Sequence, residues 1–406
     1  MLGNRVKVQE ALKVVLEVVV VVINQFVAMI CKKVIFTALL VLLALMPNVS
    51  ESAVLPEDRS DILYHRFDGG GVVIDGPSIL IRKSIKDTVS ISANYYVDNV
   101  SSASIDVVTT ASAYTEERKE QSMSVEYLRD KTVLSVNYGQ STENDYDAKS
   151  AGFNFTQDFF GDLTTLSGGY SQGWDVVGKS GDESFAEEAN RKQYRVGLSQ
   201  VVTKNSLVGL SWETITDEGF LNNPYRSVRY RDGAGFSFQS ELYPETRTSD
   251  AFSIRGMYYL PYRAAIKAEY RVFSDTWGIE AKNYELGYTH PYGEHWIFDV
   301  KLRHYEQTKA NFYSDLFSRI DAQNFRARDK EMSTFSNDSV GLSVSYEYEL
   351  LNSTFFDRFS INLAFDYIDF KFEDFRDIRV NGAAVGEEPF YTYDALVTRM
   401  FFSVWY

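Results

Sequence analysis

The stretch that decides the fold is Tyr391–Tyr406, which reads YTYDALVTRMFFSVWY. Alternate positions counted back from Tyr406 are mostly apolar, whereas Ser403 and Arg399 fall in the opposite phase. The apolar phase comprises Val404, Phe402, Met400, Thr398 and Leu396. Because the side chains of a β-strand alternate between its two faces, this pattern predicts a strand with one apolar face.

A strand of this kind at the end of the chain favours a closed barrel in a lipid bilayer. An unpaired apolar edge promotes aggregation, so a soluble protein seldom leaves one exposed. In a membrane barrel the last strand pairs with the first, and its apolar face contacts lipid. The terminal aromatic strand also resembles the signal by which bacterial outer-membrane barrels are recognised for assembly, a role that falls to Phe402, Val404 and Tyr406. A buried final strand of a soluble β-sandwich is the alternative.

The composition suits such a barrel. Among 406 residues, aromatic residues make up 15% and prolines number only 8. Tyrosine rings have an apolar body and a polar hydroxyl, and they suit strand ends at a membrane–water boundary. The formal net charge of −15 argues against nucleic acid as a partner.

Residues Met29–Ser52 have the three parts of a secretory signal peptide. Lys32 and Lys33 form a basic start, Val34–Met46 is an apolar middle, and small residues follow. We therefore expect export from the cytoplasm, cleavage at the end of this segment, and a mature chain of residues 53–406 that forms a single barrel domain.

Residues 1–28 precede this basic segment. We interpret them as the result of a start codon assigned too far upstream, so that translation begins at Met29 and residues 1–28 are not part of the mature protein. The alternative makes Val14–Ile23 a membrane anchor, but this run is too short and carries Glu17. Cys31 is the only cysteine. The mature chain is therefore expected to contain no disulfide and no covalently bound c-type haem. Without residues 1–52 the formal charge becomes −17, from 36 Lys and Arg against 53 Asp and Glu.

Period-two patterning recurs along the whole mature chain. Each segment runs for about 10–14 residues, which is the length that a tilted membrane strand requires. A single segment is weak support, but the succession is strong support for a barrel. The apolar phases span Val89–Val97, Met123–Tyr127, Leu134–Tyr138, Phe153–Phe155, Tyr194–Leu198, Val208–Trp212, Phe252–Leu260, Ile266–Val272, Tyr284–Tyr288, Trp296–Leu302, Val340–Tyr348 and Phe359–Tyr367.

The connections between these segments alternate in length. Short, turn-rich links such as Arg129–Lys131 and Thr203–Asn205 alternate with longer, polar ones. The long links are Asn99–Arg118, Gly178–Asn190, Gly219–Asp250, Ala310–Met332 and Asp374–Pro389. Short periplasmic turns and long extracellular loops are the asymmetry of a bacterial outer-membrane barrel.

The same alternation predicts the number of strands. Fifteen strands are recognisable from Ile79–Arg82 onward, and the first of them is followed by a short link. A chain that enters from the periplasm needs one more strand before it, and Ile62–Phe67 with the bend Gly69–Gly71 is available. We therefore expect an all-β, transmembrane, antiparallel up-and-down barrel of about 16 strands, with 14 as the alternative. In a second interpretation, the segment before Ile79 folds into the lumen.

Two runs near the start of the mature chain carry a family resemblance. They read YHRFDGGGVVIDGPSILIRKSI (Tyr64–Ile85) and VSISANYYVDNVSSASIDVVTTAS (Val89–Ser112). Their DGGG, GPS and ANYYVD pieces together resemble the bacterial outer-membrane β-barrel family catalogued as domain of unknown function 3570, over nearly the whole mature chain. The resemblance implies a secreted outer-membrane barrel without an established activity, in the company of periplasmic redox proteins. It supplies no catalytic residues.

Charged residues of both signs occupy the phase opposite to the apolar one between Ala251 and Tyr305. They are Arg255, Lys267, Glu269, Arg271, Glu285, Asp299, Lys301 and Arg303. In a barrel this phase faces the lumen. Such charges either line a water-filled pore and set its ion preference, or pair across neighbouring strands and brace a narrow lumen.

The sequence offers no strong catalytic or metal-binding pattern. The histidines are His65, His290, His295 and His304. His304 falls in the lipid-facing phase, where a neighbouring serine would suit an outer-membrane hydrolase. The chain has no metal-ligand spacing of His or Cys, and we expect no enzymatic activity, cofactor or metal. Asp145 with Asp147 and Asp374 with Asp377 are weak calcium candidates, which solvated loop carboxylates explain as well.

Pro224–Arg231 (PYRSVRYR) is a basic, aromatic segment on an acidic protein. Three interpretations fit it: contact with lipopolysaccharide phosphates, folding into the barrel mouth, or plain solvation.

Three functions fit these observations. The first is a porin-like or transport barrel, and the second is a non-conducting scaffold that anchors a periplasmic or surface complex. The third and least favoured is an outer-membrane hydrolase. The expected partners are outer-membrane lipids and lipopolysaccharide, the barrel-assembly machinery through the last strand, and periplasmic proteins.

Overall fold

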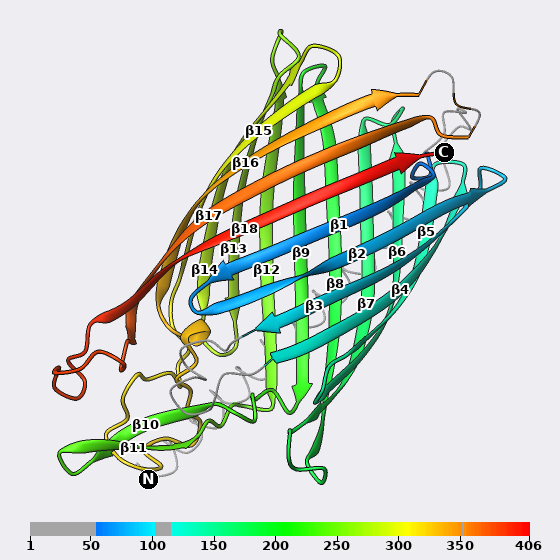
Figure 1. Ribbon diagram of the computed structural model, residues 1–406. Coiled ribbons are helices and arrows are strands. Elements are labelled where there is room, and N and C mark those ends of the chain that lie inside the picture. Colours follow the sequence, from blue (N-terminus) through cyan, green and yellow to red (C-terminus); the bar gives the residue numbers. More distant parts are fainter. Residues whose placement is uncertain (1–53, 102–114, 351–352, 354) are drawn as a thin grey trace, which may run out of the picture. The chain divides into compact units, whose positions relative to one another are not determined.

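The computed structural model describes residues 54–101, 115–350, 353 and 355–406. Sixteen antiparallel strands form one closed barrel, in which β18 pairs with β1 (Figure 1). Apart from this closing pair, neighbours in the barrel follow one another in the sequence except between β9 and β12, because β10 and β11 form a separate two-stranded sheet. No helix among the described residues is long and apolar enough to cross a membrane.

The strands of the barrel wall are long, and most exceed ten residues. Their bounds are β1 Arg59–Gly69, β2 Val72–Ile85, β3 Val89–Ser101, β4 Thr115–Arg129, β5 Thr132–Thr142, β6 Tyr146–Phe159, β7 Thr164–Gly178, β8 Ala186–Thr203, β9 Ser206–Gly219, β12 Thr246–Tyr259, β13 Ala265–Asp275, β14 Glu280–Tyr292, β15 Trp296–Gln307, β16 Phe335–Glu349, β17 Arg358–Arg376 and β18 Phe390–Trp405. The separate hairpin consists of β10 Ser227–Asp232 and β11 Gly235–Ser240, and η1 Lys330–Met332 is a short 3-10 helix.

The outer surface of the barrel is apolar because alternate residues of each strand point outward. In β18, Leu396, Met400 and Phe402 are exposed, whereas Ser403 in the opposite phase is buried. Exposed apolar side chains continue around the barrel on the other strands, among them Ile81, Val125, Val136, Val196, Leu210, Ile254, Leu286, Leu302 and Leu342. A closed sheet with this surface pairs its backbone groups internally and presents apolar side chains to lipid.

The seam between the last and first strands closes the barrel. Phe402 lies opposite Ile62 of β1 and Ile361 of β17. The Tyr406 hydroxyl lies 3.2 Å from Ser60 Oγ and donates to the carbonyl of Arg82 at 3.1 Å. The predicted pairing of the C-terminal strand with the start of the chain is therefore confirmed.

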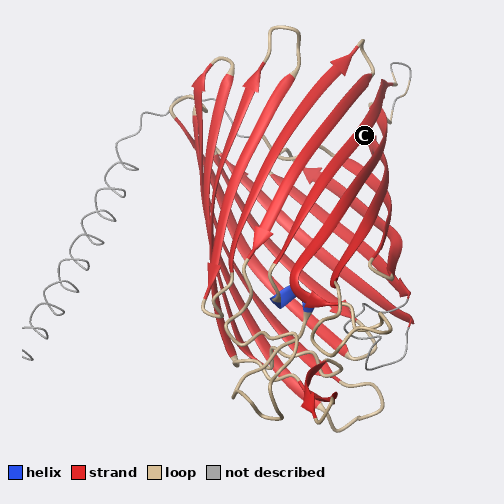
Figure 2. Ribbon diagram, turned by 90° about the vertical axis from the view of Figure 1, so that its left-hand side faces the viewer, coloured by secondary structure: helices blue, strands red, loops and turns tan. Residues whose placement is uncertain are grey.

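The two ends of the barrel differ. One end, the turn end, carries the short connections 86–88, 130–131, 160–163, 204–205, 260–264, 293–295 and 350–357 together with the barrel termini. The other end, the loop end, carries the connections 70–71, 143–145, 179–185, 220–245, 276–279, 308–334 and 377–389. Figures 1 and 2 show the long loops gathered at this end. In bacterial barrels the long loops are extracellular.

The count of sixteen strands is confirmed, and fourteen is excluded. Ile62–Phe67 lies within β1, which pairs along its length with both β18 and β2. The interpretation in which this segment folds into the lumen is therefore wrong. The signal peptide and the segment before it, predicted at residues 1–52, lie outside the described residues, as does the centre of the predicted link Asn99–Arg118.

Candidate functional site

The lumen-facing charges of β12 to β18 form ion pairs. Arg255 Nη2 lies 2.5 Å from Glu269 Oε2, on the neighbouring strand. Arg271 Nη2 lies 3.1 Å from Glu213 Oε1 of β9, so this pair reaches across β12. The carboxylate of Asp366 accepts from Arg399 and lies 3.4 Å from Lys301 Nζ.

The pair of Lys301 and Asp366 spans the intervening strand β16 because a glycine separates them. Gly341 lies opposite both residues in the register. A Cβ atom on Gly341 would lie only 2.4 Å from Asp366 Oδ1 and 3.3 Å from Lys301 Cε. The glycine on the intervening strand therefore allows the long side chains of the two flanking strands to meet on the lumen surface of the barrel wall.

The remaining predicted lumen charges lie in the same network. Arg303 donates to Asn283 Oδ1 at 2.5 Å, and Asp299 accepts from Thr289 and from Ser343. Glu285 lies between Glu269 and Arg303 in the register. A cavity of about 190 Å³ brings together Lys267, Glu285, Asp299 and Lys301 with Asp366 and Arg399. The ion pairs Arg255–Glu269 and Arg271–Glu213 do not line this cavity.

The lumen wall from β4 to β9 has a different character. Its lumen-facing positions include Ser122, Ser124, Ser135, Asn137, Gly139, Ser150, Gly152, Asn154, Ser167, Gly169, Ser171, Gly173, Gly197, Ser199, Gly209 and Ser211. Charged exceptions on this wall include Glu126, Arg195 and Glu213. We call it the small-residue wall. Side chains this short leave most of the adjacent cross-section of the barrel free.

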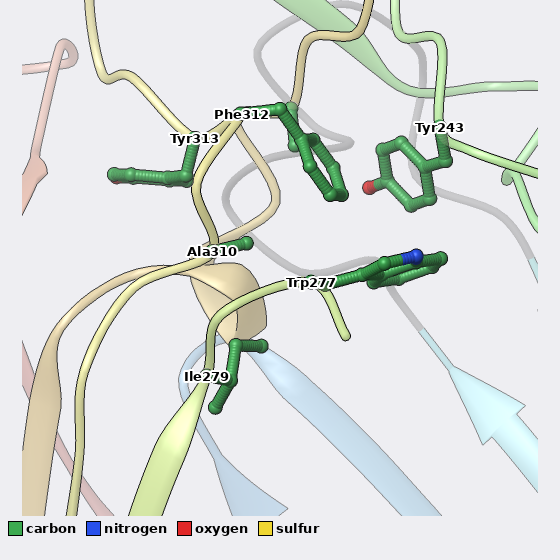
Figure 3. Close-up of a cluster of buried hydrophobic side chains, with 7 residues drawn as sticks. Tyr243, Trp277, Ile279, Ala310, Phe312 and Tyr313 are labelled. Carbon is green, nitrogen blue, oxygen red and sulfur yellow. The ribbon is translucent and has the colours of Figure 1, made fainter. Parts of the chain in front are cut away.

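Three loops at the loop end fold together into what we call the cap, residues 220–245, 308–334 and 377–389. Tyr243, Ala310, Phe312 and Tyr313 of the cap form an apolar cluster with Trp277 of the connection 276–279 (Figure 3). The indole of Trp277 donates to the carbonyl of Thr246 in β12. A second cluster, Phe372 and Phe375 of β17 with Tyr391 of β18, lies where Arg328 of the cap packs over the Phe375 ring. The cap therefore packs against β12 to β18, and its Tyr225 also donates to Asp145 beside the opposite wall.

A buried arginine joins the three loops of the cap. Arg229 of β10 is completely buried, and its guanidinium pairs with Asp315 and with Glu388 Oε1 at 2.6 Å. Arg328 Nη2 lies 3.0 Å from the other oxygen of Asp315. Burial raises the pKa of Glu388, but the hydrogen bond and charge of Arg229 together with backbone hydrogen bonds outweigh it, and the net shift is downward. The ionised pair therefore holds loops that are far apart in the sequence.

The segment Pro224–Arg231 folds into the cap at the barrel mouth. Arg226 pairs with Asp329, and Arg229 is buried as described above. The sequence did not predict the hairpin β10–β11 or a buried charge inside Gly219–Asp250, because both strands are short and Arg229 occurs in an otherwise ordinary polar loop. The basic and aromatic composition of PYRSVRYR was the only signal.

A large cavity of about 930 Å³ lies between the cap and the loop end of the small-residue wall. The wall contributes Glu116, Tyr146, Asp175, Arg191 and Asp217, and the cap contributes residues 220–226 with Tyr243, Asp329 and Met332. Its size falls within the range typical of small-molecule sites. We call it the mouth cavity.

The histidines and the calcium candidates Asp145, Asp374 and Asp377 contact other protein groups. His304 Nδ1 lies 2.7 Å from Asp338 on the outer surface, and His65 Nε2 lies 2.7 Å from Asp98. The Tyr288 hydroxyl lies 2.9 Å from His290 Nδ1, and the ring of His295 is tilted against that of Tyr346 with the centroids 5.6 Å apart. Asp374 accepts from the amide of Thr334, and Asp377 pairs with Arg379. Within the described ranges, no group of three or more His, Cys, Asp or Glu residues is arranged to hold a metal ion.

Comparison with solved structures finds distant likenesses to outer-membrane proteins. A bacterial polysaccharide outer membrane secretin matches with a TM-score of 0.45 and 10% identity, covering 86% of this chain and 99% of its own. The outer membrane protein opdK from Pseudomonas aeruginosa matches at 0.42 and 9%, covering 86% and 99%. OmpT, an outer membrane protein of Vibrio cholerae, matches at 0.40 and 10%, covering 86% and 100%. Likenesses this distant carry no argument about activity.

No protein with a curated function matches the sequence. A family model described as "Protein of unknown function (DUF3570)" matches residues 110–195 and 185–367. These spans cover more than half of the chain and include most strands of the barrel, from β4 into β17. The chain therefore belongs to the DUF3570 family and has the fold of a bacterial outer-membrane β-barrel.

Proposed function

We propose that the protein is a porin-like transport barrel through which small hydrophilic solutes cross the bacterial outer membrane. The observation that carries this proposal is the unequal character of the two lumen walls. On the wall of β12 to β18, charged side chains pair with one another, and apolar side chains pack the cap against its loop end. On the small-residue wall, serine, glycine and asparagine leave space for a column of water. The proposed path follows this second wall.

The exposure of lumen-facing charges supports a water-filled interior. The side chain of Arg255 is 61% exposed although it faces the lumen, and that of Arg271 is 44% exposed. A lumen packed with side chains would bury both. Above the small-residue wall, Asp175, Arg191 and Asp217 continue the lumen-facing phase of β7 to β9 into the mouth cavity. The cavity and the wall therefore form one continuous polar surface.

Narrowing the proposed path should lower conduction. Gly209 of β9 faces the lumen, and a Cβ atom there would meet nothing closer than the Leu198 carbonyl at 3.9 Å. Gly209→Trp is therefore expected to fold and to reduce single-channel conductance in planar bilayers by roughly half, because an indole occupies part of the water column.

Gly256 provides the matched control for this substitution. It lies in the outward phase of β12 with Ile254, and no atom lies within 4 Å of a Cβ atom built there. Gly256→Trp should face lipid and leave conductance unchanged. Equal conductance in both variants would contradict the proposed path.

The second candidate function is a non-conducting scaffold that binds a partner through the cap. The cap exposes apolar side chains, among them Phe238, Leu242, Ile320 and Phe325, each at least 40% accessible. Exposed apolar groups of this kind occur at sites of protein contact. A folded wild-type barrel that never conducts, and that is recovered from cells crosslinked through these residues to another protein, would favour the scaffold.

A further inference from the structure

The mouth cavity has a strongly unequal charge. Its lining contains six carboxylates, from Glu116, Glu143, Asp145, Asp175, Asp217 and Asp329, against two guanidinium groups, from Arg191 and Arg226. Six negative and two positive charges leave a formal charge of −4. Both cations are already engaged, because Arg191 donates to Asp217 at 2.7 Å and Arg226 pairs with Asp329.

Two of the remaining carboxylates are held by neutral donors. Asp145 accepts a hydrogen bond from the hydroxyl of Tyr225, and Asp175 accepts one from Tyr146 at 2.5 Å. A tyrosine hydroxyl orients a carboxylate without compensating its charge. These bonds fix the two carboxylates on the cavity wall, and neither bond brings a positive charge to it.

Glu143 is a further carboxylate of the lining, with one cation beside it. Its carboxylate lies in the short connection 143–145, outside the strands, and 3.7 Å from Arg118. Burial raises the pKa of Glu143, and the neighbouring carboxylates of Asp145 and Asp98 add to this shift, while Arg118 opposes it. The net upward shift shows that nearby negative charge and burial together exceed the effect of the one adjacent cation.

Aromatic rings complete the lining. Tyr146 comes from the wall, and Phe220, Tyr225 and Tyr243 come from the cap. Aromatic faces attract ammonium and guanidinium groups and also pack against alkyl chains. A cavity of this size with negative charge and aromatic rings favours a solute that combines positive charge with a short apolar stem.

We propose that the mouth cavity is a binding site for small organic cations, namely solutes with ammonium or guanidinium groups on an alkyl stem. This proposal rests on the proposed transport function and specifies its substrate class. Such a site concentrates cationic solutes at the entrance of the path and disfavours anions of the same size.

The test compares three probes of equal length that differ in charge: butane-1,4-diamine, butane-1,4-diol and succinate. Binding to the purified, folded full barrel in detergent is measured by titration calorimetry at low and moderate ionic strength. The diamine should bind, more weakly as salt increases, whereas the diol and succinate should show no saturable binding. Equal binding of the diamine and the diol, or no diamine binding, would overturn the proposal.

Substitutions locate the site. Asp145→Asn and Asp175→Asn preserve the shape of each side chain and its ability to accept from tyrosine, and each should weaken diamine binding by roughly tenfold. Asp68→Asn makes the same charge change on an exposed side chain that does not line the cavity, so affinity should stay within about twofold. If Asp68→Asn weakens binding as much as the cavity variants do, the effect belongs to overall charge and the site is refuted.

The binding measurement does not depend on conduction, so a failure of the cation-binding site can be distinguished from a failure of the transport function. Discrete conductance without diamine binding overturns the cation site and leaves the transport barrel intact. Saturable, Asp145-dependent binding in a folded barrel that never conducts supports the site and overturns the transport function.

Discussion

Arg229→Met is expected to loosen the cap while the barrel remains folded. The substitution leaves Asp315 and Glu388 without the buried guanidinium that now pairs with both. Removing one partner of a buried ion pair typically destabilises a structure by about 3–5 kcal/mol. The sixteen wall strands close without any contribution from the cap, so the loss should be confined to the loops. Limited proteolysis should then cleave within residues 220–245, and single-channel conductance should rise.

Arg231→Met is the matched control on the same hairpin. Arg231 is exposed, and its guanidinium makes one long hydrogen bond of 3.4 Å to the carbonyl of Val385. This variant should keep the protease resistance and conductance of the wild type. A cap that resists proteolysis equally in both variants would show that the buried charge cluster does not hold the loops together.

Phe402→Lys is expected to prevent most of the protein from assembling in the outer membrane. Phe402 is exposed on the outer surface of β18, the strand that closes the barrel against β1. A lysine facing lipid destabilises a barrel by about 2–4 kcal/mol at the bilayer midplane and by less toward the interface. Phe402→Leu keeps the apolar surface and should assemble normally. Heat-modifiable mobility on gels measures the folded fraction, and equal folded fractions for the two variants would refute the assigned role.

Tyr406 has its own contacts in the seam. Its ring stacks on Phe355 with the centroids 5.8 Å apart, and Lys83 Nζ lies 5.0 Å from the ring centre. Deletion of Tyr406 removes the aromatic end of the strand together with these contacts and should lower the amount of folded barrel. Tyr406→Phe retains the ring and should assemble at near wild-type levels. An equal loss of folded barrel in the deletion and in Tyr406→Phe would show that the hydroxyl, and not the ring, supports assembly.

The barrel could be predicted from the sequence because lipid imposes a simple rule on it. Each strand must present apolar residues at alternate positions, and Leu396, Met400 and Phe402 follow this rule without reference to the rest of the chain. The strand number followed from the alternation of short and long links, and the missing first strand was found by requiring the chain to enter and leave at the same end. Both deductions depend on topology rather than on side-chain packing.

The ion pairs of the lumen and the cap could not be predicted in the same way. They depend on distances between strands and loops, which the alternation of apolar and polar residues does not contain. The sequence predicted lumen charges of alternating sign, but the partner of Arg271 is Glu213 two strands away, and that of Lys301 is Asp366 across Gly341. These pairs require the register of three strands at once. The folding of the cap was unpredictable for the same reason, since Arg229, Asp315 and Glu388 lie in three separate loops.

Solutes are proposed to pass along the small-residue wall, and thiol modification tests this path most directly. Residues 54–406 contain no cysteine, so replacing Cys31 with serine leaves a background in which an introduced thiol is the single one. Ser150→Cys places a thiol on β6 of the small-residue wall, and Ser343→Cys places one on β16 among the paired charges. Single-channel conductance is recorded while a bulky methanethiosulfonate reagent is added. We expect discrete conductance that falls sharply on modification at position 150 and little at position 343. A folded barrel that never conducts, or one blocked only at position 343, would contradict it.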